Sequence, residues 1–192
     1  MKKLGLGILG SGKGSNCRAI LEQIAANKLP AEARLVISDV FDAGILDIAR
    51  EFKVPNIYLP PGSFRTRLEP KAEMEMTRLL READVDLVVL AGFMRVLKEP
   101  MLNAFPQRIV NIHPSLLPKF PGIEAWKQAL EAGEKVTGCS VHYVDAGIDS
   151  GEIIAQRTVP VLSGDTAESL HARIQAAERV LYPEVIALFC EA

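Results

Sequence analysis

Continuous apolar runs alternate along the chain with longer stretches in which apolar residues recur at helical spacing. The apolar runs predict strands at residues 4–9, 35–38, 56–59, 87–91, 108–112, 139–144 and 153–161. Between them, the helical spacing predicts helices from Ser15 or Asn16 through Ile24 and at residues 41–52, 67–83 and 123–132. The run 87–91 has no polar position, which is typical of a strand with helices over both faces.

The last predicted helix has the clearest pattern. Its apolar residues are spaced by three or four positions, share one face, and are Leu170, Ile174, Ala177 and Leu181. Asp165 is expected to cap its first turn, and Glu168 lies three residues further on, as in a capping box. Pro183 is expected to kink or end the helix because proline has no backbone N–H to donate.

This order of strands and helices predicts an α/β fold, in which a mostly parallel central sheet lies between helix layers in a three-layer α/β/α sandwich. The chain has 192 residues, and no linker, internal repeat or low-complexity segment divides it. One domain over residues 1–192 is therefore expected. Ligands of such sheets bind at the carboxyl ends of the strands, so residues that follow strands are the first candidates for chemistry.

Composition narrows the class of protein further. Apolar residues make up 48% of the chain and charged residues 24%, which disfavours a disordered chain, a fibrous repeat and a coiled coil. The 22 basic and 24 acidic residues leave a net charge of −2. We therefore expect no overall positive field that would attract nucleic acid.

The sequence predicts a cytoplasmic protein that does not enter a membrane. Its densest apolar run, residues 87–94, is far shorter than the roughly 20 residues of a membrane-spanning helix. The N-terminal apolar stretch is too short and too rich in glycine for a signal peptide. Cys17, Cys139 and Cys190 are odd in number and far apart, which argues against a disulfide framework and favours a reducing compartment.

A glycine-rich turn at residues 10–16 lies between the first predicted strand and helix. Free backbone N–H groups at such a helix start attract anions, so the turn is a candidate phosphate site, although a plain strand-to-helix turn is the alternative. Gly14 stands where the Walker motif needs Ser or Thr, and Asn16 or Cys17 stands where the dinucleotide motif needs a third glycine. Asp39 could still act as the ribose-binding acid of a dinucleotide site, which leaves a non-catalytic nucleotide-binding module as an alternative.

Asn111 and His113 end another predicted strand, where Pro114 interrupts it. Residues two apart on a strand point to the same face. An amide can donate to a developing oxyanion, and an imidazole can transfer a proton near neutral pH. A single histidine is often a purely structural residue, but the neighbouring amide and the position at a strand end favour catalysis here.

The loop at residues 145–151 lies between the last two predicted strands and carries Asp149. A carboxylate that leans over the strand end beside an imidazole would favour the protonated ring, although solvated acids in a tight loop are the simpler interpretation. Gln175 and Glu178 lie three apart on the last helix, where a solvated polar face is the simpler interpretation too. His142 and His171 do not share metal-ligand spacing with His113.

Together these motifs resemble the folate-dependent formyltransferases, and among them the phosphoribosylglycinamide formyltransferases. The resemblance runs from residues 12–16 to Tyr182-Pro183. Its most specific stretches are residues 91–95 (AGFMR), 111–118 (NIHPSLLP), 140–142 (SVH) and 149–151 (DSG). It implies the formyltransferase fold, with a Rossmann-like N-terminal half.

The resemblance also implies roles for individual residues. The matches to the family's catalytic residues are Asn111, His113 and Asp149. The matches to its residues for the substrate phosphate and ribose are Gly14, Ser15, Asn16, Gln175 and Glu178. The matches to its folate-binding residues are Arg67 (or its neighbour Arg65), Met94, Arg95, Val96, Leu97, Asn111, Asp145, Ala146, Gly147, Ile148 and Asp149. Glu124 and Trp126 stand where the family often has histidines, so a different pocket rim is expected.

The implied reaction transfers the formyl group of 10-formyltetrahydrofolate to the amine of glycinamide ribonucleotide, in de novo purine biosynthesis. His113, held protonated by Asp149, and the amide of Asn111 are expected to stabilise the oxyanion. These two small molecules are the expected partners of a monomer or homodimer, with no metal ion, nucleic acid or membrane. An alternative is a hydrolase like formyltetrahydrofolate deformylase. That enzyme and methionyl-tRNA formyltransferase usually carry a further domain, for which this chain is expected to have no room.

Overall fold

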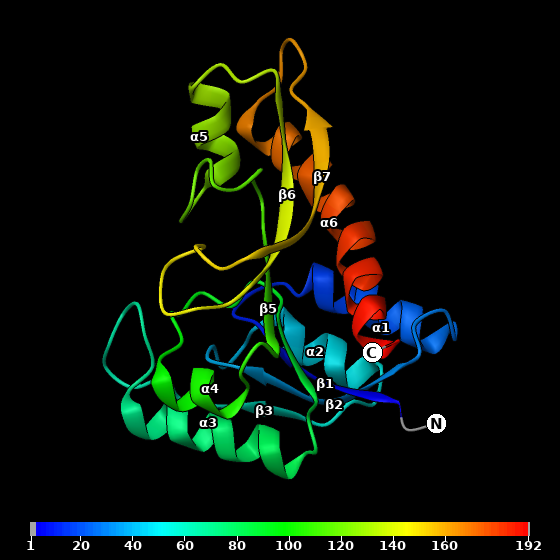
Figure 1. The fold of residues 1–192 in the computed structure, drawn as a ribbon, viewed down its shortest axis with the longest axis vertical. Helices are drawn as coiled ribbons and strands as arrows, with labels where there is room; N and C mark the ends of the chain where they lie inside the picture. Colours follow the sequence, from blue (N-terminus) through cyan, green and yellow to red (C-terminus); the bar gives the residue numbers. More distant parts are fainter. Residues whose placement is uncertain (1–2, 192) are drawn as a thin grey trace.

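Strands and helices alternate along most of the chain in the computed structural model, which describes residues 3–191 (Figure 1). The strands are β1 (Leu4–Leu9), β2 (Ala31–Ser38), β3 (Asn56–Tyr58), β4 (Leu87–Leu90), β5 (Ile109–His113), β6 (Val136–Tyr143) and β7 (Ile153–Pro160). The helices are α1 (Ser15–Ala25), α2 (Gly44–Glu51), α3 (Pro70–Glu82), α4 (Glu99–Ala104), α5 (Ala125–Glu131) and α6 (Ala167–Cys190).

The strands form one mixed sheet in the order β3-β2-β1-β4-β5-β6-β7. The first five strands in this order run parallel, and β6 and β7 are antiparallel to their neighbours. The prediction of a mostly parallel sheet in an α/β fold is confirmed. The change of direction after β5 places Asn111 directly opposite His142 of β6.

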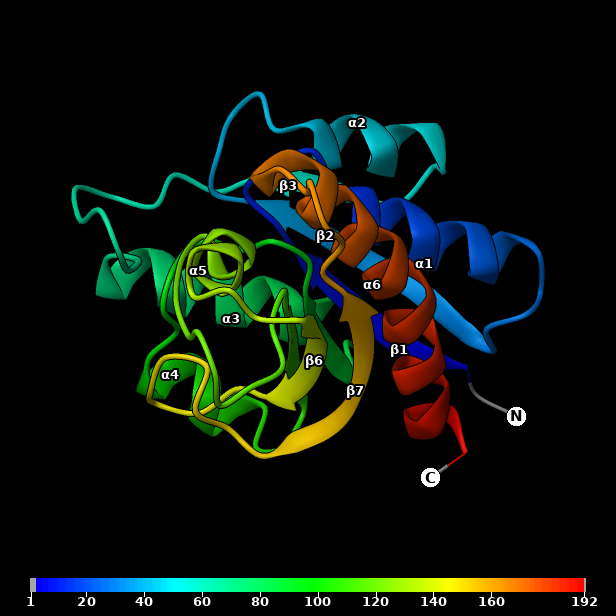
Figure 2. The same ribbon diagram turned by 90° about the horizontal axis from the view of Figure 1, so that it is seen from above.

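Helices cover both faces of the parallel part of the sheet, as Figure 2 shows. α1, α2 and α6 pack on one face in a large apolar cluster that includes Ile8, Val36 and Val89. α3 and α4 pack on the other face in a second cluster that includes Ile37 and Val88. Because successive strand residues point to opposite faces, the continuously apolar strands supply both clusters.

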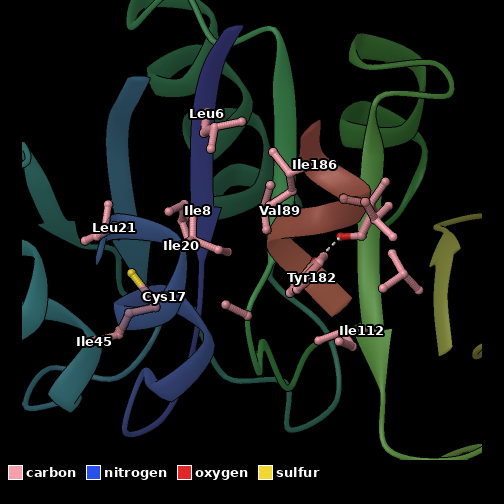
Figure 3. Packing of buried hydrophobic residues seen from close by; sticks show 14 of the residues in the cluster. Leu6, Ile8, Cys17, Ile20, Leu21, Ile45, Val89, Ile112, Tyr182 and Ile186 are labelled. Atoms are coloured by element: carbon pink, nitrogen blue, oxygen red, sulfur yellow. Dashed lines mark hydrogen bonds between the residues drawn. The ribbon is translucent and has the colours of Figure 1, made fainter. Parts of the chain in front are cut away.

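Tyr182 of α6 attaches the helix to β4 and β5, the two strands that lead into the candidate site, and Figure 3 shows its contact with β5. Its side chain is fully buried, and its hydroxyl lies 2.8 Å from the carbonyl oxygen of Leu90 and 3.0 Å from that of Val110. A buried hydroxyl must find such acceptors because an unpaired one would cost about 1–3 kcal/mol. The contact fixes α6 relative to β4 and β5.

The structure corrects several predicted boundaries. The helix α4 was not predicted, because it has only six residues and no full apolar repeat, although Pro100 in its first turn is a typical start signal. The N-cap of α1 is Gly14 rather than Ser15 or Asn16. The N-cap of α6 is Thr166, which forms a capping box with Ser169, so the expected pair Asp165 and Glu168 is one residue early.

Pro183 does not end α6, which was one of the two predicted outcomes. The helix continues through it to Cys190. Pro183 and its neighbours Tyr182, Val185 and Ile186 are buried against the sheet. Tertiary packing of this apolar face outweighs the missing backbone hydrogen bond, which is how buried helices tolerate proline.

Candidate active site

A cavity of about 690 Å³ lies at the carboxyl ends of the parallel strands. Its walls come from the turn after β1, the loops after β4 and β5, the loop between β6 and β7, and one face of α6. Most of the predicted residues line it, namely Gly14, Ser15, Asn16, Met94, Arg95, Val96, Leu97, Asn111, His113, Asp145, Gly147, Ile148, Asp149, Gln175 and Glu178. Ala146, Arg65 and Arg67 are not among its lining residues, but Thr66, between the two arginines, is.

Gly14 shapes the turn that leads from β1 into α1. It has a φ of 79°, in the left-handed region that favours glycine. A Cβ at this position would lie 2.8 Å from the Cα of Ile45, so α2 also requires glycine here. Gly14 caps the eleven-residue helix without any side-chain hydrogen bond, so no cap side chain occupies the helix N–H groups. Such a helix start can bind an anion.

Asn16 and Glu178 join this turn to α6. The Asn16 Nδ2 group donates to Oε2 of Glu178 at 3.0 Å, and both side chains are buried. Burial raises the pKa of Glu178 to about 7, although the Asn16 amide and Arg179 act in the opposite direction. The interpretation of Glu178 as part of a solvated helix face is therefore wrong, because the packing of α6 on α1 encloses it. Asn16 Oδ1 is also buried and has no hydrogen-bond partner, so it remains free to accept one from a ligand.

Asn111 is oriented by His142, which faces it from β6. The Asn111 Nδ2 atom lies 3.2 Å from His142 Nε2. His142 Nδ1 lies 2.8 Å from the carbonyl oxygen of Tyr143 and must donate to it, because a carbonyl can only accept. In the neutral ring, Nε2 is then the acceptor for the Asn111 amide. One hydrogen of that amide remains for a ligand.

His113 lies between two acceptors. Its Nε2 donates to the carbonyl oxygen of Phe120 at 2.8 Å, and its Nδ1 lies 3.4 Å from Asp149 Oδ2. Burial lowers the pKa of His113, and this effect outweighs Phe120 and Asp149, which favour the protonated ring. Burial thus opposes the protonated ring that Asp149 was expected to hold, because the ring is 4% exposed and loses most of its hydration.

Asp149, in the loop between β6 and β7, lies close to both His113 and His142. In addition to the His113 contact, the Asp149 Oδ1 atom lies 3.6 Å from His142 Nε2. The backbone N–H of Gly122 donates to Asp149 Oδ2 at 2.8 Å. Burial acts to raise the pKa of Asp149, but the contacts with His142, Gly122 and His113 lower it overall. The side chain is thus an ionised, half-buried carboxylate, and not the solvated acid of an open loop. Its φ of 49° is unusual for a residue other than glycine.

Asp39 does not offer a free acid to a dinucleotide. Its Oδ1 accepts from Ser11 Oγ at 2.5 Å, and its Oδ2 accepts from Arg95 Nε at 2.6 Å. Both oxygens are already engaged by the protein, and the side chain is 3% exposed. This geometry argues against the nucleotide-binding alternative.

Sequence reasoning missed the contributions of His142 and His171, although it expected Trp126 at the rim of the pocket. The role of His142 depends on the antiparallel pairing of β5 with β6, which no local pattern reveals. Trp126 of α5 and His171 of α6 stack with ring centroids 3.6 Å apart and an interplanar angle of 3°, and both line the cavity. The spacing of His171, Gln175 and Glu178 by four and three residues places them on one helix face, which could have suggested His171.

Residues 3–191 contain no group of three or more His, Cys, Asp or Glu side chains placed to hold a metal ion. Within the same range, no helix is both long and apolar enough to cross a membrane.

Comparisons with known proteins agree with this geometry. Residues 6–186 match the formyl transferase family. Phosphoribosylglycinamide formyltransferase of Bacillus subtilis is 42% identical over 188 residues, which cover 97% of this chain and 93% of that protein. The crystal structure of glycinamide ribonucleotide transformylase 1 from Symbiobacterium toebii is 49% identical, with a TM-score of 0.94 over 98% of this chain and 88% of that chain. The trifunctional purine biosynthetic protein adenosine-3 of Drosophila pseudoobscura pseudoobscura is 46% identical over 94% of this chain. The matched region is only 13% of the length of that larger protein.

Proposed function

The chain belongs to the formyl transferase family, and we propose that it transfers the formyl group of 10-formyltetrahydrofolate to the amine of glycinamide ribonucleotide. The products are formylglycinamide ribonucleotide and tetrahydrofolate, and the step belongs to de novo purine biosynthesis. One observation carries the proposal: Asn111, His113 and Asp149 converge in a cavity that also contains the start of α1, where no cap side chain occupies the backbone N–H groups. We place this single domain in the cytoplasm, as a monomer or homodimer with small-molecule partners.

The ribonucleotide occupies the end of the cavity between α1 and α6. Its phosphate accepts hydrogen bonds from the turn at Gly14, Ser15 and Asn16, where backbone N–H groups and the positive end of the helix dipole favour an anion. Gln175 and Glu178 lie on the α6 wall and face the ribose, whose hydroxyls both donate and accept hydrogen bonds. The buried Asn16–Glu178 contact keeps these two walls together.

The folate occupies the end of the cavity after β4. Met94 and Ile148 line this cavity and are each 64% exposed, and Ile123 is 71% exposed. Exposed apolar side chains around a concave site are typical of a surface that covers a flat aromatic ligand. The segment 94–97 and the loop residues 145–149 supply the polar backbone groups around the pterin. Arg67, with Arg65 as the neighbouring candidate, contacts the anionic tail of the folate from outside the cavity.

The reaction begins when the neutral amine of the ribonucleotide attacks the formyl carbon. A carbon–nitrogen bond forms, and the formyl oxygen becomes an oxyanion. The amide N–H of Asn111 donates to that oxygen, and so does the Nδ1–H that His113 carries once it is protonated, since its Nε2–H already donates to Phe120. Donors already aimed at developing charge lower the barrier. The bond from the formyl carbon to the folate nitrogen then breaks. The proton lost by the attacking nitrogen moves to the departing folate nitrogen, through water or Asp149.

His113 changes its charge preference during this reaction. Burial lowers the pKa of His113 and so favours the neutral ring. The negative charge on the formyl oxygen favours the protonated ring, because an adjacent opposite charge stabilises imidazolium. Asp149, whose pKa is lowered, stays ionised and supports that protonated state from the Nδ1 side.

An assay with glycinamide ribonucleotide and 10-formyltetrahydrofolate tests the proposal, with the ribonucleotide omitted in a parallel reaction. We expect formylated ribonucleotide and tetrahydrofolate in equal amounts, and little donor consumption without the acceptor. Equal release of formate in both reactions would instead identify a hydrolase of the deformylase type. Tight binding of NAD or ATP without any formyl transfer would support the nucleotide-binding module.

A further inference from the structure

Three loops at the carboxyl edge of the sheet meet at one buried carboxylate. Asp39 follows β2, and its two oxygens accept hydrogen bonds from different loops. Ser11, from the turn between β1 and α1, donates to Oδ1 at 2.5 Å. Arg95, from the loop after β4, donates to Oδ2 at 2.6 Å. A single side chain therefore connects two segments that are more than 80 residues apart in the sequence.

The contacts continue beyond Asp39 in both directions. Ser11 Oγ accepts from the N–H of Met94 at 2.9 Å, and the Ser11 N–H donates to the Gly92 carbonyl at 3.0 Å. The Arg95 guanidinium donates to the carbonyls of Phe64 and Arg67, the latter at 3.3 Å. The loop after β3 is thereby attached to the same network.

The network lies between the two ends of the cavity described under the proposed function. Ser11 is three residues before Gly14 in the phosphate-side turn, and Arg95 belongs to the folate-side segment 94–97. Asp39 is not among the residues that line the cavity, so it is not placed to contact a ligand there. Its effect on the reaction must act through Ser11 and Arg95.

We propose that Asp39 is a positioning residue, which holds the phosphate-side turn and the folate-side segment 94–97 in the positions that bind the two substrates. The inference rests on the proposed function. A carboxylate suits this task because one side chain accepts from a hydroxyl and a guanidinium at once. The Arg95 side chain is only 15% exposed, so without Asp39 its charge would be left partly buried and without a charged partner.

Steady-state kinetics of Asp39→Ala, Asp39→Asn and Ser11→Ala test the proposal, with each substrate varied in turn. We expect Asp39→Ala to raise the KM of the formyl donor about tenfold and that of the ribonucleotide about threefold, with kcat changed less than about threefold, because positioning acts through binding. Asn has the same shape and can still accept from Arg95, so Asp39→Asn should restore most of both KM values. Ser11→Ala should also raise both KM values, because it removes the hydroxyl that joins the phosphate-side turn to Asp39.

Glu51→Gln is the matched control, because Glu51 pairs with Arg18 in an exposed contact between α1 and α2. It should leave both KM values and kcat unchanged. Asp39→Ala with both KM values within twofold of the wild type, in a protein that unfolds at the same temperature, would overturn the proposal. If Asp39→Ala does not fold, Asp39→Asn and Ser11→Ala decide the question, and normal KM values in both variants would overturn it.

A binding measurement separates this inference from the proposed function. If the wild-type protein makes no formylated product, tetrahydrofolate is titrated calorimetrically into the wild type and Ser11→Ala. Weaker binding by Ser11→Ala supports the positioning role even though the proposed reaction has failed. Equal binding by the two proteins, or no binding by the wild type, overturns the positioning role as well.

Discussion

At the scale of single residues, backbone carbonyl groups orient the histidine rings of the site. Phe120 accepts from His113 Nε2, and Tyr143 accepts from His142 Nδ1. These contacts fix which ring nitrogens carry hydrogen. The ring of His142 can then accept from Asn111, so the amide is held in a single orientation. Catalytic groups held in this way need little rearrangement when charge develops.

His113→Ala should lower kcat by on the order of 10²–10³, because one donor to the oxyanion is lost. The KM of the ribonucleotide should change little, since its phosphate is proposed to bind at the turn of residues 14–16. Initial rates at saturating substrates, together with circular dichroism, measure both effects. Near-normal turnover by a folded variant would refute the assignment of His113.

Glu178 should make stability depend on pH. Its pKa is about 7 in the folded protein and 4.5 as a free side chain, so the folded state binds more protons between these values. The free energy of unfolding should therefore fall as pH rises from about 4.5 to 7, by on the order of 3 kcal/mol from this group. Glu178→Gln should flatten that part of the curve in urea unfolding measured at several pH values. If the free energy of unfolding of Glu178→Gln depends on pH as steeply as that of the wild type, burial does not raise the pKa of Glu178.

At the scale of elements, the site depends on how α5 and α6 pack. α6 has its buried polar residue Glu178 among apolar residues that contact the sheet, and Tyr182 fixes the helix to β4 and β5. The shorter α5 joins this helix through the stack of Trp126 on His171. Burial lowers the pKa of His171, which favours a neutral ring in the stack.

A double-mutant cycle of Trp126→Ala and His171→Ala should show a coupling energy of about 0.5–1.5 kcal/mol, which is typical of a stacked aromatic pair. The free energy of unfolding in urea measures each corner of the cycle. A cycle of Trp126→Ala with Phe41→Ala is the control, because Phe41 packs on Tyr58 of β3 instead. The control pair should be additive, and an additive first cycle would mean that the stack contributes no coupling.

At the scale of the whole molecule, the two parts of the sheet contribute different groups to one cavity. The parallel part presents the turn at residues 14–16 and the segment 94–97, while the antiparallel pair β6–β7 presents His142 and the loop of Asp149. β5 lies between the two parts and carries Asn111 and His113. Binding of both substrates therefore requires the whole sheet to be assembled.

Glycinamide ribonucleotide should raise the temperature of unfolding, because a ligand that binds only the folded state stabilises it by about 2.7 kcal/mol at 100 times its Kd. Asn16→Ala should lose most of this increase at the same ligand concentration, since it removes the Asn16–Glu178 hydrogen bond that joins the two walls around the ribonucleotide. Glu51→Gln should keep the full increase. A full increase in Asn16→Ala would show that this hydrogen bond does not support ribonucleotide binding.

The apolar runs and turn residues were sufficient to predict the layers of the fold. All seven strands were predicted within a few residues, because each is a short buried run between residues that favour turns. The failures were a short helix, α4, and the path of α6 through Pro183, where packing from elsewhere in the chain outweighs local preference. Helix ends shifted by a residue or two for the same reason.

By itself, the sequence determined the sheet, the glycine-rich turn, and the strand end that carries Asn111 and His113, because these features depend on neighbouring residues. Only the tertiary structure decided that Glu178 is buried, that His142 faces Asn111, and that burial lowers the pKa of His113. It also decided that Asp39 connects two loops. Each of these properties depends on residues distant in the sequence, since burial, strand pairing and charge partners arise only when the elements pack together.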